Sequence, residues 1–154
     1  MNIHDYLDPR AIIINCESLT SEGVIRELGA RLFDLGYVKR GFVQATLTRE
    51  GTMPTGLPLG GDVNAAIPHV DIEYVKKSAL ALATLKEPVL FRNMVDQDES
   101  VPVRLVIMLA LDQPKSQIEM LQSVAGLLQK PELIKSIMAA RKPQDIINAL
   151  KTAK

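Results

Sequence analysis

The chain has 154 residues, of which 47% are apolar and 23% are charged. These values are typical of soluble globular proteins and exclude a long disordered chain, a fibrous repeat and a disulfide scaffold. The length predicts a single domain over residues 1–154 with its own core. The 18 basic and 18 acidic residues cancel, and no segment concentrates lysine or arginine, so nothing favours a nucleic-acid partner.

The sequence also lacks the usual signals for membrane insertion, secretion and metal binding. Its longest apolar run, residues 105–111, is far shorter than the roughly 20 residues that cross a bilayer. No basic stretch leads into an apolar one at the N-terminus, so we expect a cytoplasmic protein with no direct membrane insertion. The single cysteine, Cys16, has no partner at metal-ligand spacing, and we predict a half-buried bystander thiol and no metal or cofactor.

The first third of the chain predicts one strand and two helices. Residues 11–14 are apolar and mostly β-branched, which is typical of a strand. A serine or threonine can cap a helix over residues 20–35, where apolar residues recur at three- and four-residue spacing. A second helix is expected over residues 41–50, and its apolar stripe continues into Arg49 and Glu50. Charges at such a position usually have partners.

A run rich in glycine and proline follows over residues 51–62. Its composition predicts an irregular loop, and loops of this length in compact domains are more often functional than decorative. The loop leads into a strand of small residues over 63–67, where Pro68 favours extended backbone at the residue before it. His69 then stands where this strand ends.

The second half predicts a buried sheet and three helices. Residues 78–85 and 103–110 are nearly continuous apolar runs, as in strands covered on both faces. Helices are expected over residues 114–129, 131–140 and 143–153, each starting at or next to a proline. In the first of them the in-phase apolar residues are assigned to the core: Ile118, Leu121, Val124, Ala125 and Leu128. Together these elements predict an α/β fold, with a mixed β-sheet flanked by helices on both faces.

Two histidines are available for chemistry, and His4 lies in a terminal segment that we expect to be mobile. His69 is therefore the histidine that we expect to be ordered. A neutral imidazole is a good nucleophile near neutral pH and can carry a phosphoryl group, provided that cationic and hydrogen-bonding groups hold the phosphoryl oxygens. Arg49 and the hydroxyl of Thr55 are the local candidates for that task.

Each of these residues also has a structural interpretation. A single histidine after a strand is most often structural, an arginine near a helix end most often interacts with the helix dipole, and a threonine in a Pro-Thr-Gly turn most often serves the turn. Asp71 and Glu73, beyond the histidine, could orient the imidazole, but solvated acids are the commoner case and no role is assigned to them.

Three short motifs together give a more specific indication. Arg49-Glu50, then Pro54-Thr55-Gly56, then Ala66-Ile67-Pro68-His69 resemble the enzyme IIA components of the mannitol and fructose type in the bacterial sugar phosphotransferase system. Within that group the sequence is most similar to the galactitol-type enzyme IIA, and the resemblance covers nearly the whole chain.

The resemblance implies an α/β fold and a phosphohistidine at His69. It implies that the phosphoryl group arrives from phosphorylated HPr and leaves to a cysteine of the partner enzyme IIB, which phosphorylates sugar brought in by the membrane component IIC. The family's arginine corresponds to Arg49 and its threonine to Thr55. Its second histidine corresponds to Gln117, as in galactitol-like members, and a glutamine can form hydrogen bonds but cannot titrate. The loop between Thr55 and His69 is longer than in mannitol-type proteins.

The predicted function is a phosphocarrier for the uptake of galactitol or a related sugar. The same domain type also serves in regulators, where phosphorylation of the histidine changes protein binding and feeds no sugar. A third possibility is a binding domain whose histidine is never phosphorylated. The sequence does not identify the sugar, because a IIA subunit need not touch it.

Overall fold

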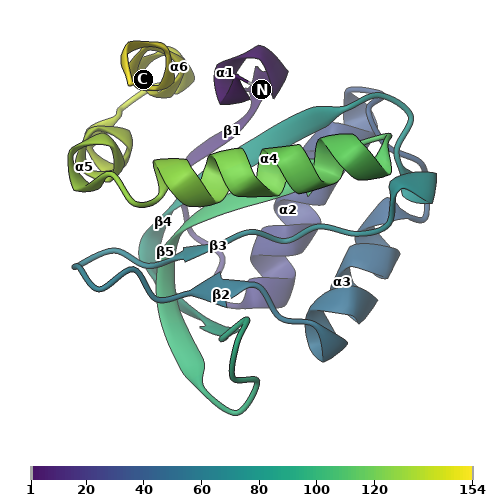
Figure 1. Cartoon of the computed structure of the whole chain (residues 1–154), viewed down its shortest axis with the longest axis horizontal. Helices are drawn as coiled ribbons and strands as arrows, with labels where there is room; N and C mark the ends of the chain where they lie inside the picture. The colour runs from purple at the N-terminus through teal and green to yellow at the C-terminus, as the bar shows by residue number, and fades with distance from the viewer. Residues whose placement is uncertain (1, 154) are drawn as a thin grey trace.

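The computed structural model of the chain describes residues 2–153 and is organised around a mixed sheet of five strands (Figure 1). The order across the sheet is β1-β4-β5-β3-β2. The strands are β1 (Leu7–Cys16), β2 (Gly56–Leu57), β3 (Ala65–Ala66), β4 (Ala79–Arg92) and β5 (Ser100–Ala110). The pairs β1–β4 and β3–β5 are parallel, whereas β4–β5 and β2–β3 are antiparallel, so the predicted mixed sheet is confirmed.

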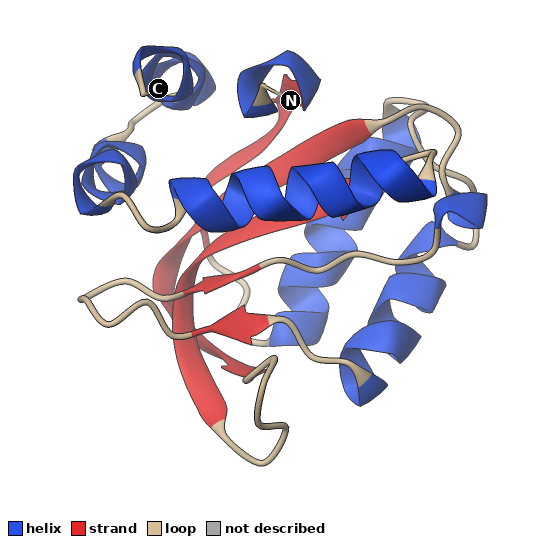
Figure 2. Cartoon of the chain, in the orientation of Figure 1, coloured by secondary structure: helices blue, strands red, loops and turns tan. Residues whose placement is uncertain are grey.

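Helices cover both faces of the sheet, as predicted (Figure 2). One face carries α2 (Ser21–Asp34) and α3 (Phe42–Thr52). The other face carries α1 (Ile3–Tyr6), α4 (Pro114–Leu127), α5 (Pro131–Ala139) and α6 (Pro143–Thr152), and a short 3-10 helix, η1, spans Ile72–Tyr74. The last three helices each begin at the proline that the sequence indicated. No helix of residues 2–153 is long and apolar enough to cross a membrane.

The central strand β4 divides its side chains between two cores. Ala79, Ala81 and Ala83 belong to the core under α2 and α3, whereas Leu80 and Leu82 belong to the core under α4, α5 and α6. This division follows from the two-residue period of a strand, which sends successive side chains to opposite faces. The small alanines let α2 lie close to the sheet, and the larger leucines fill the space under the other helices.

The N-terminal segment differs from the prediction. We expected the segment around His4 to be mobile, but Ile3 to Tyr6 form α1, which packs on α6 and β1 and buries Ile3. Cys16 is fully buried rather than half-buried, and its thiol lies 3.1 Å from a carboxylate oxygen of Glu27. Burial is the main cause that raises the pKa of this thiol, which keeps it protonated and unreactive.

The core assignment along α4 was wrong in part. The side chains that α4 buries are Met120 and Val124, and Leu128 follows them just after the helix. Ile118, in contrast, is 59% exposed, and Ala125 is exposed as well. The apolar stripe of this helix is wider than the strip that the sheet can cover, so its outer part remains at the surface.

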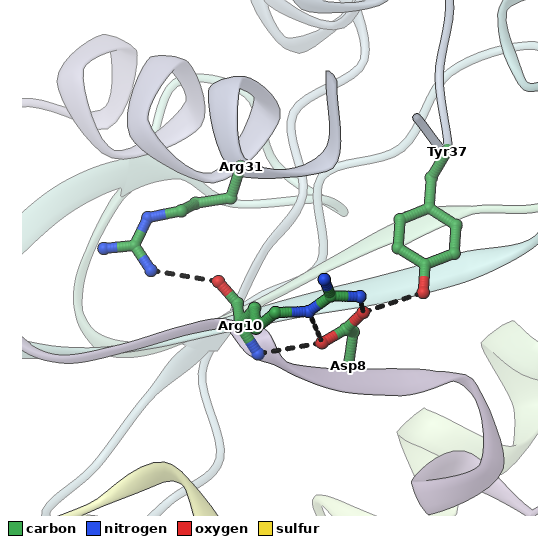
Figure 3. Close-up of polar contacts among 4 residues, drawn as sticks. All are labelled: Asp8, Arg10, Arg31 and Tyr37. Carbon is green, nitrogen blue, oxygen red and sulfur yellow. Dashed lines mark hydrogen bonds and ion pairs between the residues drawn. The ribbon is translucent and has the colours of Figure 1, made fainter. Parts of the chain in front are cut away.

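A polar cluster fastens the start of β1 to α2 and the loop after it (Figure 3). Arg10 donates from Nε and Nη2 to the carboxylate of Asp8 at 3.1 and 2.8 Å, and the hydroxyl of Tyr37 donates to the same carboxylate at 2.8 Å. Arg31 on α2 donates to the backbone carbonyl of Arg10 at 3.0 Å. The hydrogen bonds from Arg10 are the main reason why the pKa of Asp8 is lowered to about 2.

Candidate functional site

His69 lies just after β3, beside the C-terminal part of β5. The backbone N–H of Leu109 donates to the carbonyl of Pro68 at 3.0 Å, and His69 itself pairs with Leu109 in a parallel bridge. The side chain is buried, with 7% of the residue exposed. The predicted position of His69 at the end of a strand is therefore confirmed, and the neighbouring strand β5 fixes the backbone that carries it.

One nitrogen of the His69 ring is already engaged. Nδ1 lies 2.8 Å from the backbone carbonyl oxygen of Ile67. A carbonyl oxygen can only accept a hydrogen bond, so Nδ1 carries the proton and Nε2 keeps its lone pair. Burial is the main cause that lowers the pKa of His69, and the charge of Arg49 acts in the same direction, against the Ile67 carbonyl and Asp71. The ring is accordingly neutral near pH 7, with Nε2 as its nucleophilic atom.

His69 faces a cavity of about 510 Å³ that also includes Arg49 and Thr55. The remaining lining comes from the segment after α3, from β2, from the residue after β3, from the β4–β5 loop and from α4: Met53, Pro54, Leu57, Ile67, Met94, Gln97, Leu121, Gln122 and Ala125. Three of the four residues singled out in the sequence thus meet at one place. The fourth, Gln117, is half-buried on α4, one helical turn before Leu121, and is not among the residues that line the cavity.

Arg49, near the C-terminal end of α3, has donors that the protein does not use. Its Nη1 lies 3.8 Å from a carboxylate oxygen of Asp71, whose side chain is 70% exposed, so this ion pair is long and screened by solvent. Its Nε is buried and has no hydrogen-bond partner, the one such side-chain nitrogen or oxygen among residues 2–153. A buried unpaired donor is costly unless a ligand satisfies it, so this guanidinium is suited to bind an anion.

The carboxylate of Glu50, the next residue along α3, is hydrogen-bonded to Thr55. Its two carboxylate oxygens accept hydrogen bonds from the Thr55 backbone N–H at 2.8 Å and from the Thr55 hydroxyl at 2.9 Å. Burial raises the pKa of Glu50, and these two hydrogen bonds and the charge of Arg49 oppose that rise. The acid therefore holds Thr55 in place and does not point a free carboxylate at the cavity.

The arrangement fits the transfer of an anionic group. A neutral imidazole nitrogen and a guanidinium share a small, partly apolar cavity, where electrostatic attraction is stronger than in water. Within the described part of the chain, no three histidine, cysteine, aspartate or glutamate side chains come together as metal ligands do.

Part of the cavity lining could not be anticipated from the sequence. Met94 and Gln97 belong to the loop between β4 and β5, and two hydrogen bonds hold this loop over the site. The N–H of Met94 donates to the Gly56 carbonyl, and the Gln97 side chain donates to the Thr52 carbonyl, both at 2.8 Å. Asp71, to which no role was assigned, is the residue that pairs with Arg49. No local pattern indicates these contacts.

Comparison with known proteins identifies the family. The family model of the phosphoenolpyruvate-dependent sugar phosphotransferase system, EIIA 2, matches residues 5–153. The chain belongs to this family. EIIA components of this kind are phosphotransferases that work through a phosphohistidine intermediate, which agrees with the resemblance found in the sequence.

The relatives of this EIIA domain include a component of a sugar phosphotransferase system and a transcriptional regulator. The galactitol-specific EIIA component of Escherichia coli K12 is 31% identical over 121 residues, which are 79% of each chain. The transcriptional regulator ManR of Bacillus subtilis is 29% identical over 84% of this chain, but the match covers only 18% of ManR. A solved complex of enzyme IIAMtl and phosphorylated enzyme IIBMtl from Escherichia coli matches with 26% identity and a TM-score of 0.75, covering 93% of this chain and 95% of that one.

Proposed function

We propose that His69 accepts a phosphoryl group from phosphorylated HPr and passes it to a cysteine of a cognate EIIB, for the uptake of galactitol or a related sugar through a membrane component IIC. The observation that carries the proposal is the pairing of a neutral imidazole, anchored through Nδ1, with the unsatisfied guanidinium of Arg49 in one cavity. The galactitol-specific relative supports the choice of sugar, and the relative solved with phosphorylated EIIB supports the choice of acceptor.

In the proposed reaction, the Nε2 lone pair of His69 attacks phosphorus while the bond between phosphorus and HPr breaks. Arg49 binds the phosphoryl oxygens and offsets their charge during the transfer. A thiolate of EIIB then attacks the same phosphorus, the Nε2–phosphorus bond breaks, and His69 returns to its neutral form. Thr55 lines the same cavity and is held there by its hydrogen bonds to Glu50. We assign Gln117 an amide hydrogen bond at the α4 edge of the site, in place of a second histidine.

The surface around the cavity supports transfer between proteins. Two exposed apolar side chains line the cavity, Met53 and Met94, and two more are close in the chain to lining residues: Val95 follows Met94, and Ile118 lies about one helical turn before Leu121. They come from the end of α3, the β4–β5 loop and α4, so apolar side chains from three elements lie near the cavity. Exposed apolar groups next to a reactive side chain favour docking of a protein surface over binding of a free small molecule.

The test is incubation with phosphoenolpyruvate, enzyme I and HPr, followed by intact-mass measurement. The wild type should gain one acid-labile phosphoryl group, His69→Ala should gain none, and His4→Ala should behave as wild type does. Addition of an EIIB domain should then remove the group. A wild-type chain that gains no phosphoryl group, or a His69→Ala variant that still gains one, would contradict the proposal.

A regulatory module is the second candidate, and the match to a segment of ManR favours it. In that case the histidine is phosphorylated in the same way, but the phosphoryl group controls binding to another protein. The discriminating result is the step after phosphorylation. Rapid transfer to EIIB supports transport, whereas a stable phosphohistidine that EIIB does not discharge supports regulation.

A further inference from the structure

The carboxylate of Glu50 is the first member of a continuous chain of hydrogen bonds that ends at the ring of His69. Glu50 accepts from the N–H and hydroxyl of Thr55 at 2.8 and 2.9 Å. The carbonyl of Thr55 accepts from the N–H of Ile67 at 3.2 Å. The carbonyl of Ile67 in turn accepts from Nδ1 of His69 at 2.8 Å. The chain thus joins the last turns of α3 to the imidazole through two short strands.

Of the two short strands beside these hydrogen bonds, β3 is also paired with β5, whereas β2 lies at the edge of the sheet and has little other support. β2 and β3 consist of two residues each, paired as Gly56 with Ala66 and Leu57 with Ala65. Thr55 is the residue just before β2, and only 1% of it is exposed. So short a pairing does not fix its own register, because few hydrogen bonds and few side chains specify it. The bond pair from Thr55 to Glu50 therefore anchors this edge of the sheet to a long helix.

We propose that Glu50 is a positioning residue for phosphoryl transfer: it holds Thr55, and through Thr55 and the Ile67 carbonyl it keeps His69 with Nδ1 protonated and Nε2 free. The proposal rests on the function proposed for His69. Glu50 does not touch the reacting atoms. Its effect reaches the imidazole through the backbone: the Thr55 carbonyl binds the N–H of Ile67 on one side of this segment, β5 supports the segment on the other side, and the Ile67 carbonyl selects the tautomer.

The same geometry changes the role of the Thr55 hydroxyl. From the sequence, this hydroxyl was a candidate donor to the phosphoryl oxygens. A threonine hydroxyl has one proton, and here that proton is directed at Glu50. The hydroxyl therefore has no proton left for a phosphoryl oxygen while Glu50 accepts it. Arg49 remains the donor for the phosphoryl group, and two consecutive residues of α3 divide the work: Arg49 binds the anion and Glu50 places the nucleophile.

The test compares Glu50→Ala, Glu50→Gln and Thr55→Val, with Glu73→Gln as a matched control. Glu73 is an exposed carboxylate four residues after His69, so its replacement removes the same charge near the site without touching Thr55. Two quantities are measured: the rate of phosphoryl transfer from phosphorylated HPr, and the ¹⁵N chemical shifts of the His69 ring, which report its tautomer without any partner protein.

Glu50→Ala should transfer about 100-fold more slowly, because a misplacement of about 1 Å has that effect on oriented reactions. Its ring should populate both tautomers. Glu50→Gln should restore most of the rate, since the amide oxygen can accept from the Thr55 N–H while the amide N–H donates to the hydroxyl oxygen. Thr55→Val, which keeps only the backbone bond, should give an intermediate loss, and Glu73→Gln should match wild type.

The proposal is overturned if Glu50→Ala keeps both the wild-type rate and a single tautomer, or if Glu50→Gln loses as much as Glu50→Ala. Should Glu50→Ala fail to fold, Glu50→Gln and Thr55→Val still decide, because each keeps at least one bond of the pair. The two proposals fail in distinguishable ways. A wild-type chain that accepts no phosphoryl group defeats the phosphocarrier function, while the tautomer measurement still tests the role of Glu50.

Discussion

Two arginine–carboxylate pairs in this EIIA domain differ in how fully their hydrogen bonds are satisfied. At the start of β1, Asp8 receives two side-chain bonds from Arg10 and one from Tyr37 (Figure 3), and its pKa is lowered to about 2. At the end of α3, Arg49 approaches Asp71 only to 3.8 Å, and its Nε has no partner. In the first pair three side-chain hydrogen bonds hold the carboxylate, whereas in the second a buried guanidinium nitrogen has no partner.

This difference separates a structural cluster from the proposed binding site. Hydrogen bonds that are already formed in the free protein, such as those to the Asp8 carboxylate, stabilise the fold and gain nothing from a ligand. A buried donor without a partner has the opposite effect: the free protein is less stable than it could be, and an incoming anion recovers that loss. Four predictions test the comparison.

The largest expected effect is on phosphoryl transfer in Arg49→Ala. The rate from phosphorylated HPr should fall by about 100- to 1,000-fold, the range seen when one charge-stabilising donor is removed from an active site. Arg49→Lys should recover only part of it, because an ammonium keeps the charge but not the planar fork of donors. Stopped-flow or quench-flow transfer measurements provide the rates.

The matched control for that prediction is Arg10→Ala at the satisfied pair. It should transfer phosphoryl groups at the wild-type rate but unfold at a lower urea concentration than Arg49→Ala. If both variants lost transfer equally, the distinction between the two pairs would be wrong.

The second prediction concerns stability at the satisfied pair. Asp8→Asn should lower the free energy of unfolding at pH 7 by about 1 to 2 kcal/mol, as expected for hydrogen bonds to a charged group. The folded-state pKa of Asp8, about 2, lies below its ordinary value of 3.8, so the ionised carboxylate stabilises the fold above pH 4. The difference between wild type and variant should therefore shrink from pH 4 to pH 2 in urea titrations. A constant difference would contradict this explanation.

The third prediction concerns the pH dependence of stability at His69. Because folding lowers its pKa below the ordinary 6.5, the unfolded chain binds a proton more readily than the folded one. The contribution of His69 to stability is thus lost as the pH falls through 6.5 and below. In His69→Gln, the free energy of unfolding should decline less steeply from pH 7.5 to pH 5 than in wild type. Equal slopes would show that His69 has an ordinary pKa.

The smallest effect is expected for Asp71→Asn. Loss of a long, exposed ion pair should change the transfer rate by less than about threefold. The change should be an increase at low salt, where Arg49 is released to the phosphoryl group, and should vanish at high salt. A tenfold decrease would instead make Asp71 a residue that the reaction requires.

The parts of this structure that the sequence predicted are those with a local signal. Prolines marked the start of three helices, apolar runs marked β4 and β5, and Pro68 marked the extended backbone that presents His69. Arg49 was placed on the right side of α3 because helical periodicity alone determines which side chains share a face.

The features that the sequence did not predict depend on contacts between segments that are far apart in the chain. Three contacts join residues that share no sequence pattern. They are the pairing of Gly56 with Ala66, the approach of Asp71 to Arg49, and the placement of Met94 beside the cavity. Periodicity likewise could not show which apolar residues of α4 the sheet would cover, and Ile118 was misassigned for that reason.

Gly56 determines how closely the β4–β5 hairpin can approach the site. A Cβ at this position would lie 2.6 Å from the carbonyl oxygen of Arg92, far inside van der Waals contact. The hairpin therefore rests directly on the backbone of β2, and its loop holds Met94 beside the cavity. Any larger residue at position 56 would displace the hairpin, and Met94 with it, and so change the shape of the cavity proposed to receive a partner's phosphorylated side chain. The shape of this cavity therefore depends on a residue that has no side chain.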